Sequence, residues 1–270
     1  RLRGGRGNCS ATHWRVAFSN RYDRSTRYGN VGFRVATAQA QTYTELIKVT
    51  GGTLTMGDEY GLGSKDEQPT HQVTLSDFYI GKTEVTVAQY RVYCNATGVS
   101  MPEEPSFGWT NNAPIVNVSW SAAINYCDWL SQKLDKNISL PTEAQWEYAA
   151  RGGNQSQGYT YAGGPSMATA GWYTDNSEDK THNVATKKAN ELGLYDMSGN
   201  VWEWCRDWYD GDYYASSPST NPKGPTSGAF RVLRGGGWFN SASNCRVAFR
   251  NFNNPSFRFY YDGFRVALSQ

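Results

Sequence analysis

Hydrophobic and polar residues follow two different patterns along the chain. Apolar and polar positions alternate in Ile47–Met56 and His71–Ile80, which predicts two strands joined by a polar loop from Gly57 to Pro69. Helical spacing appears only between residues 86 and 152, and residues 153–230 are rich in Gly, Asn and Ser. The pattern therefore predicts an α+β fold that is irregular and loop-rich, with a few short helices.

Three helices are predicted because each is preceded by a Ser or Thr whose hydroxyl can cap the first turn. They start after Thr86 (ending near Asn95, with Gly98 beyond), after Ser119 (ending near Leu134) and after Thr142 (stopping at Gly152). Gln89 and Gln145 stand three residues after the first and third caps, so both helices are expected to begin with a capping box.

An internal repeat is the most informative feature of the sequence. Arg3–Ala36 and Arg234–Ala267 align without a gap, and both keep an opening RGG, a central RVAF and a closing GFRVA. Apolar and polar residues alternate in RVAF and GFRVA, which predicts half-buried strands. The segments between these anchors differ between the copies, and we expect them to be loops that face solvent.

The repeat divides the chain into three parts. A strand–loop–strand piece of this length cannot bury a core alone, so residues 1–38 are interpreted as a partial repeat of the domain's C-terminal segment. Residues 39–44 have the composition of a linker, and residues 45–270 are expected to hold the complete domain.

Composition and charge exclude several classes of function. The net charge is only +2 and charged residues make up 19% of the chain, which is not the footprint of a nucleic-acid-binding protein. No apolar run approaches the roughly 20 residues that span a bilayer, although a lipid anchor upstream stays compatible with the sequence. Three histidines, and five cysteines without a CxxC pair, give no zinc-type ligand pattern.

Four motifs within residues 45–270 point to a family. They are GGTLTMG (Gly51–Gly57), DFYIGKTEVTVAQY (Asp77–Tyr90), LPTEAQWEYAARGG (Leu140–Gly153) and LGLYDMSGNVWEW (Leu192–Trp204). With RVLRGGGW and GFRVA, they make the chain resemble the formylglycine-generating enzyme, or sulfatase-modifying factor, domain. The resemblance implies a C-type-lectin-like fold of the formylglycine-generating-enzyme type, and such a fold hosts both enzymes and pure binding proteins.

The same resemblance argues against catalysis in this chain. The active enzymes of the family hold copper between two cysteines that follow the RGG turn, and soft thiolates suit Cu(I). Cys245 matches the second of these positions, but Asn240 occupies the first, and an amide cannot replace a thiolate. In the N-terminal copy Cys9 matches the first position and Trp14 the second. We therefore expect neither copper nor catalytic residues; a formylglycine-generating-type cysteine oxidase or related modifying enzyme is the alternative.

The segment between the C-terminal anchors resembles the variable region of retroelement-diversified proteins, such as a spirochaete surface variable lipoprotein. In that group, template adenines are replaced during reverse transcription, so that Asn codons also yield Tyr, Phe, Ser and Asp. The resemblance places the variable region at about residues 238–264, called the variable segment below.

The composition of the variable segment fits a binding surface, because Tyr and Phe give rigid contact area and Asn and Ser give adaptable hydrogen bonds. Trp238 is expected in the core, and Phe249 fits either a core or a ligand-facing position. The candidate ligand-binding residues are Phe239, Asn240, Ser241, Phe249, Asn251, Phe252, Asn253, Asn254, Phe257, Phe259, Tyr260, Tyr261 and Asp262.

A structural calcium ion is implied by the family resemblance. The corresponding ligands here are the Asp196 and Glu203 side chains and the Gly199 and Val201 carbonyls, and such oxygen ligands suit calcium. Alternation along the chain places Glu203 opposite its tryptophan neighbours, where its charge needs a partner. The alternative is that both acids only accept hydrogen bonds from the backbone of the turn.

These observations favour a non-catalytic ligand-binding protein that displays a retroelement-diversified surface on a lectin-like scaffold. We expect its partner to be a protein or another cell-surface ligand. By analogy with the variable proteins, we expect the chain at the surface of a bacterium. A third class of function is an adhesin or a structural surface protein whose loops do not vary.

Overall fold

The computed structural model describes residues 2–3, 19–20 and 43–269. The chain divides into two units, Arg1–Ala40 and Gln41–Gln270. In the first unit, β1 (Leu2–Arg3) pairs antiparallel with β2 (Ser19–Asn20). The rest of the predicted partial repeat, including Cys9 and Trp14, lies outside the described residues.

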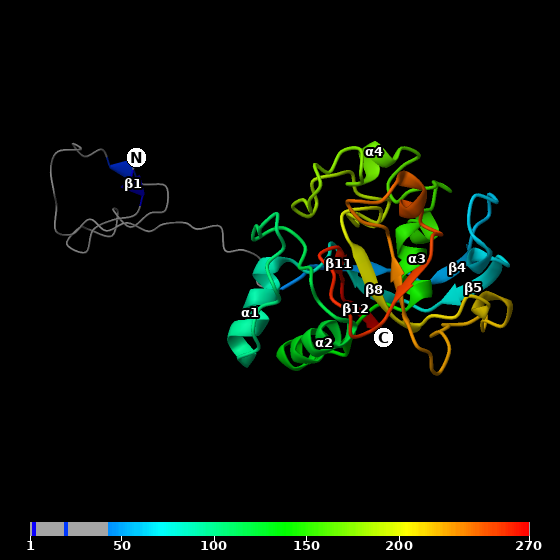
Figure 1. Cartoon of the computed structure of the whole chain (residues 1–270), viewed down its shortest axis with the longest axis horizontal. Coiled ribbons are helices and arrows are strands. Elements are labelled where there is room, and N and C mark those ends of the chain that lie inside the picture. Colours follow the sequence, from blue (N-terminus) through cyan, green and yellow to red (C-terminus); the bar gives the residue numbers. More distant parts are fainter. Residues whose placement is uncertain (1, 4–18, 21–42, 270) are drawn as a thin grey trace. The chain divides into compact units, whose positions relative to one another are not determined.

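The second unit contains three small sheets (Figure 1). One has the order β3 (Leu46–Val49), β6 (Phe78–Gly81), β12 (Ala267–Ser269) and β7 (Ile138–Ser139), so that the first and last strands of the unit lie in one sheet. Another is a ribbon of β4 (Gly52–Met56) and β5 (His71–Leu75). The third has the order β10 (Asn251–Asn253), β9 (Arg231–Arg234), β8 (Trp202–Trp208) and β11 (Asp262–Gly263).

The three predicted helices are confirmed. They are α1 (Val87–Thr97), α2 (Trp120–Leu134) and α3 (Glu143–Ala150). The structure also contains the one-turn helix α4 (Met167–Ala170) and the short 3-10 helices Lys65–Glu67, Gly153–Gln155, Tyr213–Ala215 and Ala242–Cys245. Thr86 and Thr142 form the expected capping boxes, and the Ser119 hydroxyl accepts the Ala122 amide. Helix α1 ends at Gly98 with φ of 76°, a left-handed conformation that favours glycine.

Two hydrophobic cores lie on either side of the central strand β8. Trp202 and Trp204 pack with α1 and α2, whereas Cys205 packs with α3, β4 and β5. Figure 1 shows this arrangement, with α1 and α2 on one side of β8 and α3, β4 and β5 on the other. Because both faces of β8 are covered, its residues from Trp202 to Cys205 are all buried.

Four strand predictions need correction. In the GFRVA segment only Gly263 and Ala267 belong to strands, and all five residues are buried. The segments predicted as single strands at Ile47–Met56 and His71–Ile80 are each divided between two strands of different sheets. The RVAF segment, Arg246–Phe249, is a turn and not a strand. The carbonyls of Val247, Ala248 and Phe249 accept hydrogen bonds from the Arg234 guanidinium, which takes the place of a neighbouring strand.

The helices of the described residues are short and mixed in polarity. Among residues 43–269 none combines the length and the apolar character needed to cross a bilayer.

Candidate functional site

Ring contacts link most aromatic side chains of the variable segment, namely Trp238, Phe239, Phe257, Phe259, Tyr260 and Tyr261. Phe252 instead contacts Tyr209 and Phe230 outside the segment. Phe239, Phe252, Phe257 and Tyr260 keep 39%, 42%, 49% and 48% of their surface exposed. The rings of Phe239 and Tyr261 lie 4.6 Å apart, and those of Phe259 and Tyr261 stack 5.0 Å apart at an interplanar angle of 3°. Exposed aromatic surface of this kind is typical of an interaction site.

Trp238 and Phe249 connect the variable segment to the hydrophobic core. Trp238 is only 7% exposed, as expected of a core residue, and its ring contacts Phe239 and Tyr260. Phe249 is partly buried and lies 5.9 Å from the Trp202 ring in the core. The exposed rings of Phe239 and Tyr260 therefore pack against the buried ring of Trp238.

A hollow of about 380 Å³ opens among these rings. No charged side chain belongs to its lining, which combines aromatic rings with carboxamides. Its residues are Trp202, Leu233, Phe239, Asn240, Asn244, Phe249, Asn251, Phe252, Asn253, Phe259 and Tyr261. The hollow can therefore offer ring stacking and amide hydrogen bonds to a ligand, without an ion pair.

The other predicted residues of the variable segment fall into two groups. Ser241 is exposed, and Asn253 and Asn254 are partly exposed at the end of β10. Asp262 was expected on the binding surface, but it is fully buried, so this expectation is corrected. Its backbone continues the third sheet as β11 beside β8, which turns the side chain inward. Burial raises the pKa of Asp262 to about 8.

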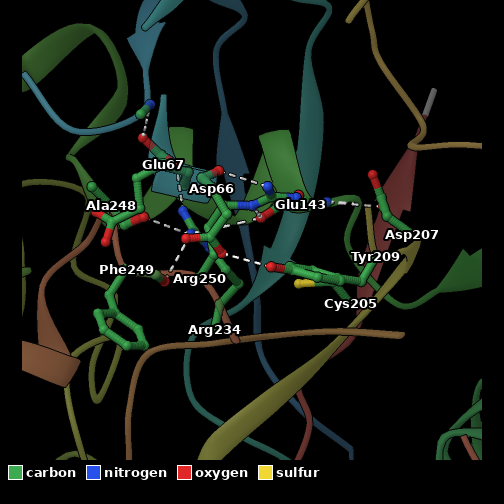
Figure 2. A network of polar contacts seen from close by, with 12 residues as sticks. Asp66, Glu67, Glu143, Cys205, Asp207, Tyr209, Arg234, Ala248, Phe249 and Arg250 are labelled. Carbon is green, nitrogen blue, oxygen red and sulfur yellow. Dashed lines mark hydrogen bonds and ion pairs between the residues drawn. The ribbon is translucent and has the colours of Figure 1, made fainter. Parts of the chain in front are cut away.

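A network of buried ion pairs fixes the variable segment to the scaffold. The Arg250 guanidinium donates to both carboxylate oxygens of Glu143 on α3, at 2.7 and 2.9 Å (Figure 2). Four residues earlier, Arg246 donates to both oxygens of Glu67, at 2.9 and 2.8 Å. Bidentate arginine–carboxylate pairs fix orientation as well as position.

Arg234 at the end of β9 completes the network. Its guanidinium pairs with Glu147 on α3 and donates to the carbonyls of Ala248 and Phe249, which Figure 2 shows beside it. Sequence reasoning missed this network. The signal was present, because α3 places Glu143 and Glu147 four residues apart among Trp, Tyr and Ala, where unpaired carboxylates would be costly.

The cysteine chemistry of the site is limited by burial. Cys245 is fully buried, and burial raises the pKa of its thiol to about 12, so the thiol is protonated at neutral pH. Asn240 uses its side-chain oxygen to accept the Gly237 amide at 2.9 Å. The residues that match the copper-binding pair of the family therefore form a structural turn.

The residues of the implied calcium site fit a cation only in part. Both oxygens of Glu203 contact the Arg265 guanidinium, at 2.6 and 2.7 Å, and one also accepts the Trp146 indole N–H. Asp196 differs, because only its Oδ2 is used, by the Ala185 amide at 2.7 Å. Its Oδ1 is buried and has no hydrogen-bond partner among the described residues. Both oxygens of Glu203 are thus occupied by protein hydrogen bonds, whereas Asp196 has one oxygen free to bind a cation.

Glu84 provides a second free oxygen that sequence reasoning did not identify. Glu84 lies between β6 and α1 and is fully buried. Its Oε2 lacks a hydrogen-bond partner within the described part of the chain. Burial and the charge of Asp196 raise the pKa of Glu84. Asp196 has its pKa raised to about 6 by burial. Two buried carboxyl groups therefore lie close enough to influence each other.

Comparisons with known proteins agree with this geometry. Residues 35–270 match the family model described as the sulfatase-modifying factor enzyme 1-like domain. The formylglycine-generating enzyme of Streptomyces coelicolor is 34% identical over 284 residues, which cover 82% of this chain and 88% of the enzyme.

Solved structures show the same fold. Treponema denticola variable protein 1 has a TM-score of 0.72 at 31% identity, over 83% of this chain and 95% of that protein. PvdO from Pseudomonas aeruginosa has a TM-score of 0.77 at 28% identity, over 86% of this chain and 96% of that protein. The expected C-type-lectin-like fold with few short helices is therefore confirmed. The chain belongs to the sulfatase-modifying factor enzyme 1-like family, with the fold shared by formylglycine-generating enzymes and the Treponema variable protein.

Proposed function

We propose that this protein is a non-catalytic binding protein whose variable segment contacts a protein or another cell-surface ligand. The observation that carries the proposal is the exposed aromatic surface of Phe239, Phe252, Phe257 and Tyr260. Phe239 and Phe252 also line the uncharged hollow, and buried ion pairs anchor the segment that carries all four rings. An enzyme of this family would need two thiols at this place. Asn240 removes one, and the burial of Cys245 suppresses thiolate formation.

Diversification of the variable segment is part of the proposal. Its test is deep sequencing of the 3′ end of the gene from many clones of one source population. We expect substitutions confined to the codons of residues 239–262, at positions that derive from template adenines. A uniform sequence would instead identify a protein with fixed loops.

The alternative enzymatic function has its own test. The copper-loaded full chain is incubated with a cysteine-containing sulfatase peptide, and aldehyde formation is followed by mass spectrometry. We expect no aldehyde above the level given by a Cys245→Ser variant. Formation of aldehyde by the native chain alone would replace the binding proposal by the oxidase. We also propose that the protein acts at the bacterial cell surface. Protease added to intact cells should then degrade it.

We also infer that Asp196 and Glu84, and not Glu203, hold the calcium ion that the family resemblance implies. Each offers a buried oxygen without a partner among the described residues, and calcium prefers such oxygens. Calcium should raise the melting temperature of the native chain relative to EDTA, and this shift should disappear in Asp196→Asn. An equal melting temperature of the native chain in calcium and EDTA would exclude the site.

A further inference from the structure

A second hollow lies outside the variable segment. Two cavities of about 510 and 550 Å³ share the lining residues Asn137, Ser139, Arg206 and Lys223, so they adjoin one another, and together they are called the basic groove below. Its walls come from α2, β7, the start of α3, the end of β8 and the loop of residues 221–226. Figure 1 shows α2, β12 and the C-terminal end near one another on this side of the unit. No lining residue belongs to residues 238–264.

Three cationic side chains meet at the basic groove. Arg206 and Lys223 are exposed at its centre. Arg231 is half-buried, with its guanidinium carbon 3.7 Å from the ring centre of Trp120 and 3.3 Å from that of Trp208. Its Nη1 donates to the Arg206 carbonyl at 2.6 Å, which fixes it beside the groove. Within residues 43–269, no carboxylate oxygen lies within ion-pair distance of any of the three.

Of the three carboxylates near the basic groove, only Asp128 is exposed and unpaired in the described part of the chain, against three cationic side chains. Asp77 lines one end but is paired with Lys48 at 2.9 Å. Asp128 is exposed on α2 at the other end. Asp207 lies buried behind the wall, where it accepts the Glu143 amide at 3.0 Å. Positive charges gathered without partners repel one another, and a bound anion would relieve that repulsion.

The remaining polar lining suits hydroxyl groups. Asn137 is exposed, and its carboxamide has no partner among the hydrogen bonds of the described residues. The Ser139 hydroxyl donates to the Leu140 carbonyl at 3.0 Å and the Thr142 hydroxyl accepts the Gln145 amide at 3.2 Å, so each hydroxyl keeps capacity for a further hydrogen bond. Gln145 is held in place by donating to the Ser269 hydroxyl at 3.1 Å. Amides and hydroxyls can each donate to and accept from a ligand hydroxyl, whereas they offer nothing specific to an apolar ligand.

We propose that the basic groove binds a hydroxylated anion, namely a sugar that carries a phosphate or carboxylate group. Arg206 and Lys223 contact the anionic group, and the amide and hydroxyl side chains contact the sugar hydroxyls. The two cations of the centre differ in role, because Arg206 can form two parallel hydrogen bonds to the anion and Lys223 acts as a point charge. Since its lining lies outside the variable segment, the groove binds the same ligand in every variant of the proposed diversified surface.

The test is calorimetric titration of the full chain with four probes: glucose 6-phosphate, glucuronate, glucose and inorganic phosphate. We expect both sugar anions to bind more tightly than glucose and inorganic phosphate, and to bind more weakly as salt increases. The stronger of the two identifies the anionic group that the groove prefers. Arg206→Gln and Lys223→Gln should each weaken sugar-anion binding by about tenfold.

The matched control is Lys133→Gln, because Lys133 is an exposed lysine of α2 that does not line the groove. This variant should bind like the native chain, and thermal unfolding of all three variants should show that the fold is intact. Equal binding of glucose and its phosphate, native affinity in both groove variants, or no heat at millimolar sugar anion would each overturn the proposal. If inorganic phosphate bound as tightly as glucose 6-phosphate, the groove would recognise only the anionic group, and the proposal of a sugar ligand would be wrong.

Discussion

At the scale of single residues, the burial of Asp262 makes the stability of the fold depend on pH. Its pKa is about 8 in the folded chain because of burial, compared with 3.8 for the free group. The folded state therefore favours the protonated form, and stability falls as the pH rises from about 4 to about 8. Asp262→Asn keeps the shape of the protonated acid and cannot ionise. We expect it to stabilise the chain by about 2 kcal/mol or more at pH 8.5 and by little at pH 4.

Urea unfolding at both pH values measures this difference. Asp212→Asn is the control, because Asp212 has 84% of its side chain exposed and is expected to unfold like the native chain at both values. If Asp262→Asn stabilised the chain equally at pH 4 and pH 8.5, ionisation of Asp262 would not be the cause.

The expectation that this chain binds no copper rests mainly on Asn240, which stands where the family resemblance implies a cysteine. A soft ion such as Cu(I) needs thiolate ligands, and the Cys245 thiol is buried and protonated near neutral pH. Asn240→Cys adds a thiol on the same turn, and we expect the variant to bind about one Cu(I). Competition with a chromophoric Cu(I) chelator measures this, and Asn240→Ser provides the control without sulfur. Retention of Cu(I) by the native chain and by Asn240→Ser would show that Cys245 needs no partner.

At the scale of elements, α3 and the middle of the variable segment depend on one another. Arg250 is 3% exposed and neutralises Glu143 of α3, so Arg250→Ala leaves a buried carboxylate without its main partner. Removing one member of a buried pair costs about 3–5 kcal/mol, and we expect a loss in this range. Phe257 is 49% exposed, so Phe257→Ala should change stability by less than about 1 kcal/mol.

Urea unfolding of the two variants compares the base of the segment with its surface. A loss in Phe257→Ala as large as that in Arg250→Ala would mean that the exposed rings hold the segment in place. The expected larger loss in Arg250→Ala would instead explain how exposed residues can vary while the backbone of the segment stays fixed.

Local signals predicted the helices well and the strands less well. Thr86, Ser119 and Thr142 act within one turn of their own helices, so the sequence contains all the information that sets these starts. The strands depend on partners far along the chain, such as β12 between β6 and β7. Arg246–Phe249 has the alternation of a strand, but the Arg234 guanidinium takes up its carbonyls. Such a contact leaves no periodic trace in the sequence.

At the scale of the whole molecule, the proposed binding surface and the scaffold use different residues of the same segment. The candidate residues from Phe239 to Tyr261 are named from the resemblance of the segment to a variable region, and its content of Asn, Ser, Phe and Tyr supports that choice. Asp262 has the same residue type as a ligand-facing acid, and only the pairing of β11 with β8 shows that it points inward. The basic groove could not be predicted, because Arg206, Lys223 and Asn137 come together only through the order of strands and helices.

The second unit has its own hydrophobic cores and sheets among the described residues, so we expect it to fold by itself. Both hydrophobic cores are formed by residues of 43–269, and its first strand, β3, pairs with β6 of the same unit. We therefore expect a fragment of residues 41–270 to unfold cooperatively, within about 2 °C of the melting temperature of the full chain, as followed by circular dichroism. A fragment of residues 50–270 lacks β3 and the fully buried Val49, and it should melt at least about 5 °C lower. If the 41–270 fragment lost as much stability as the shorter one, residues 1–40 would contribute to the fold of the domain. Equal melting temperatures of all three chains would instead show that β3 is dispensable, contrary to its place in the first sheet.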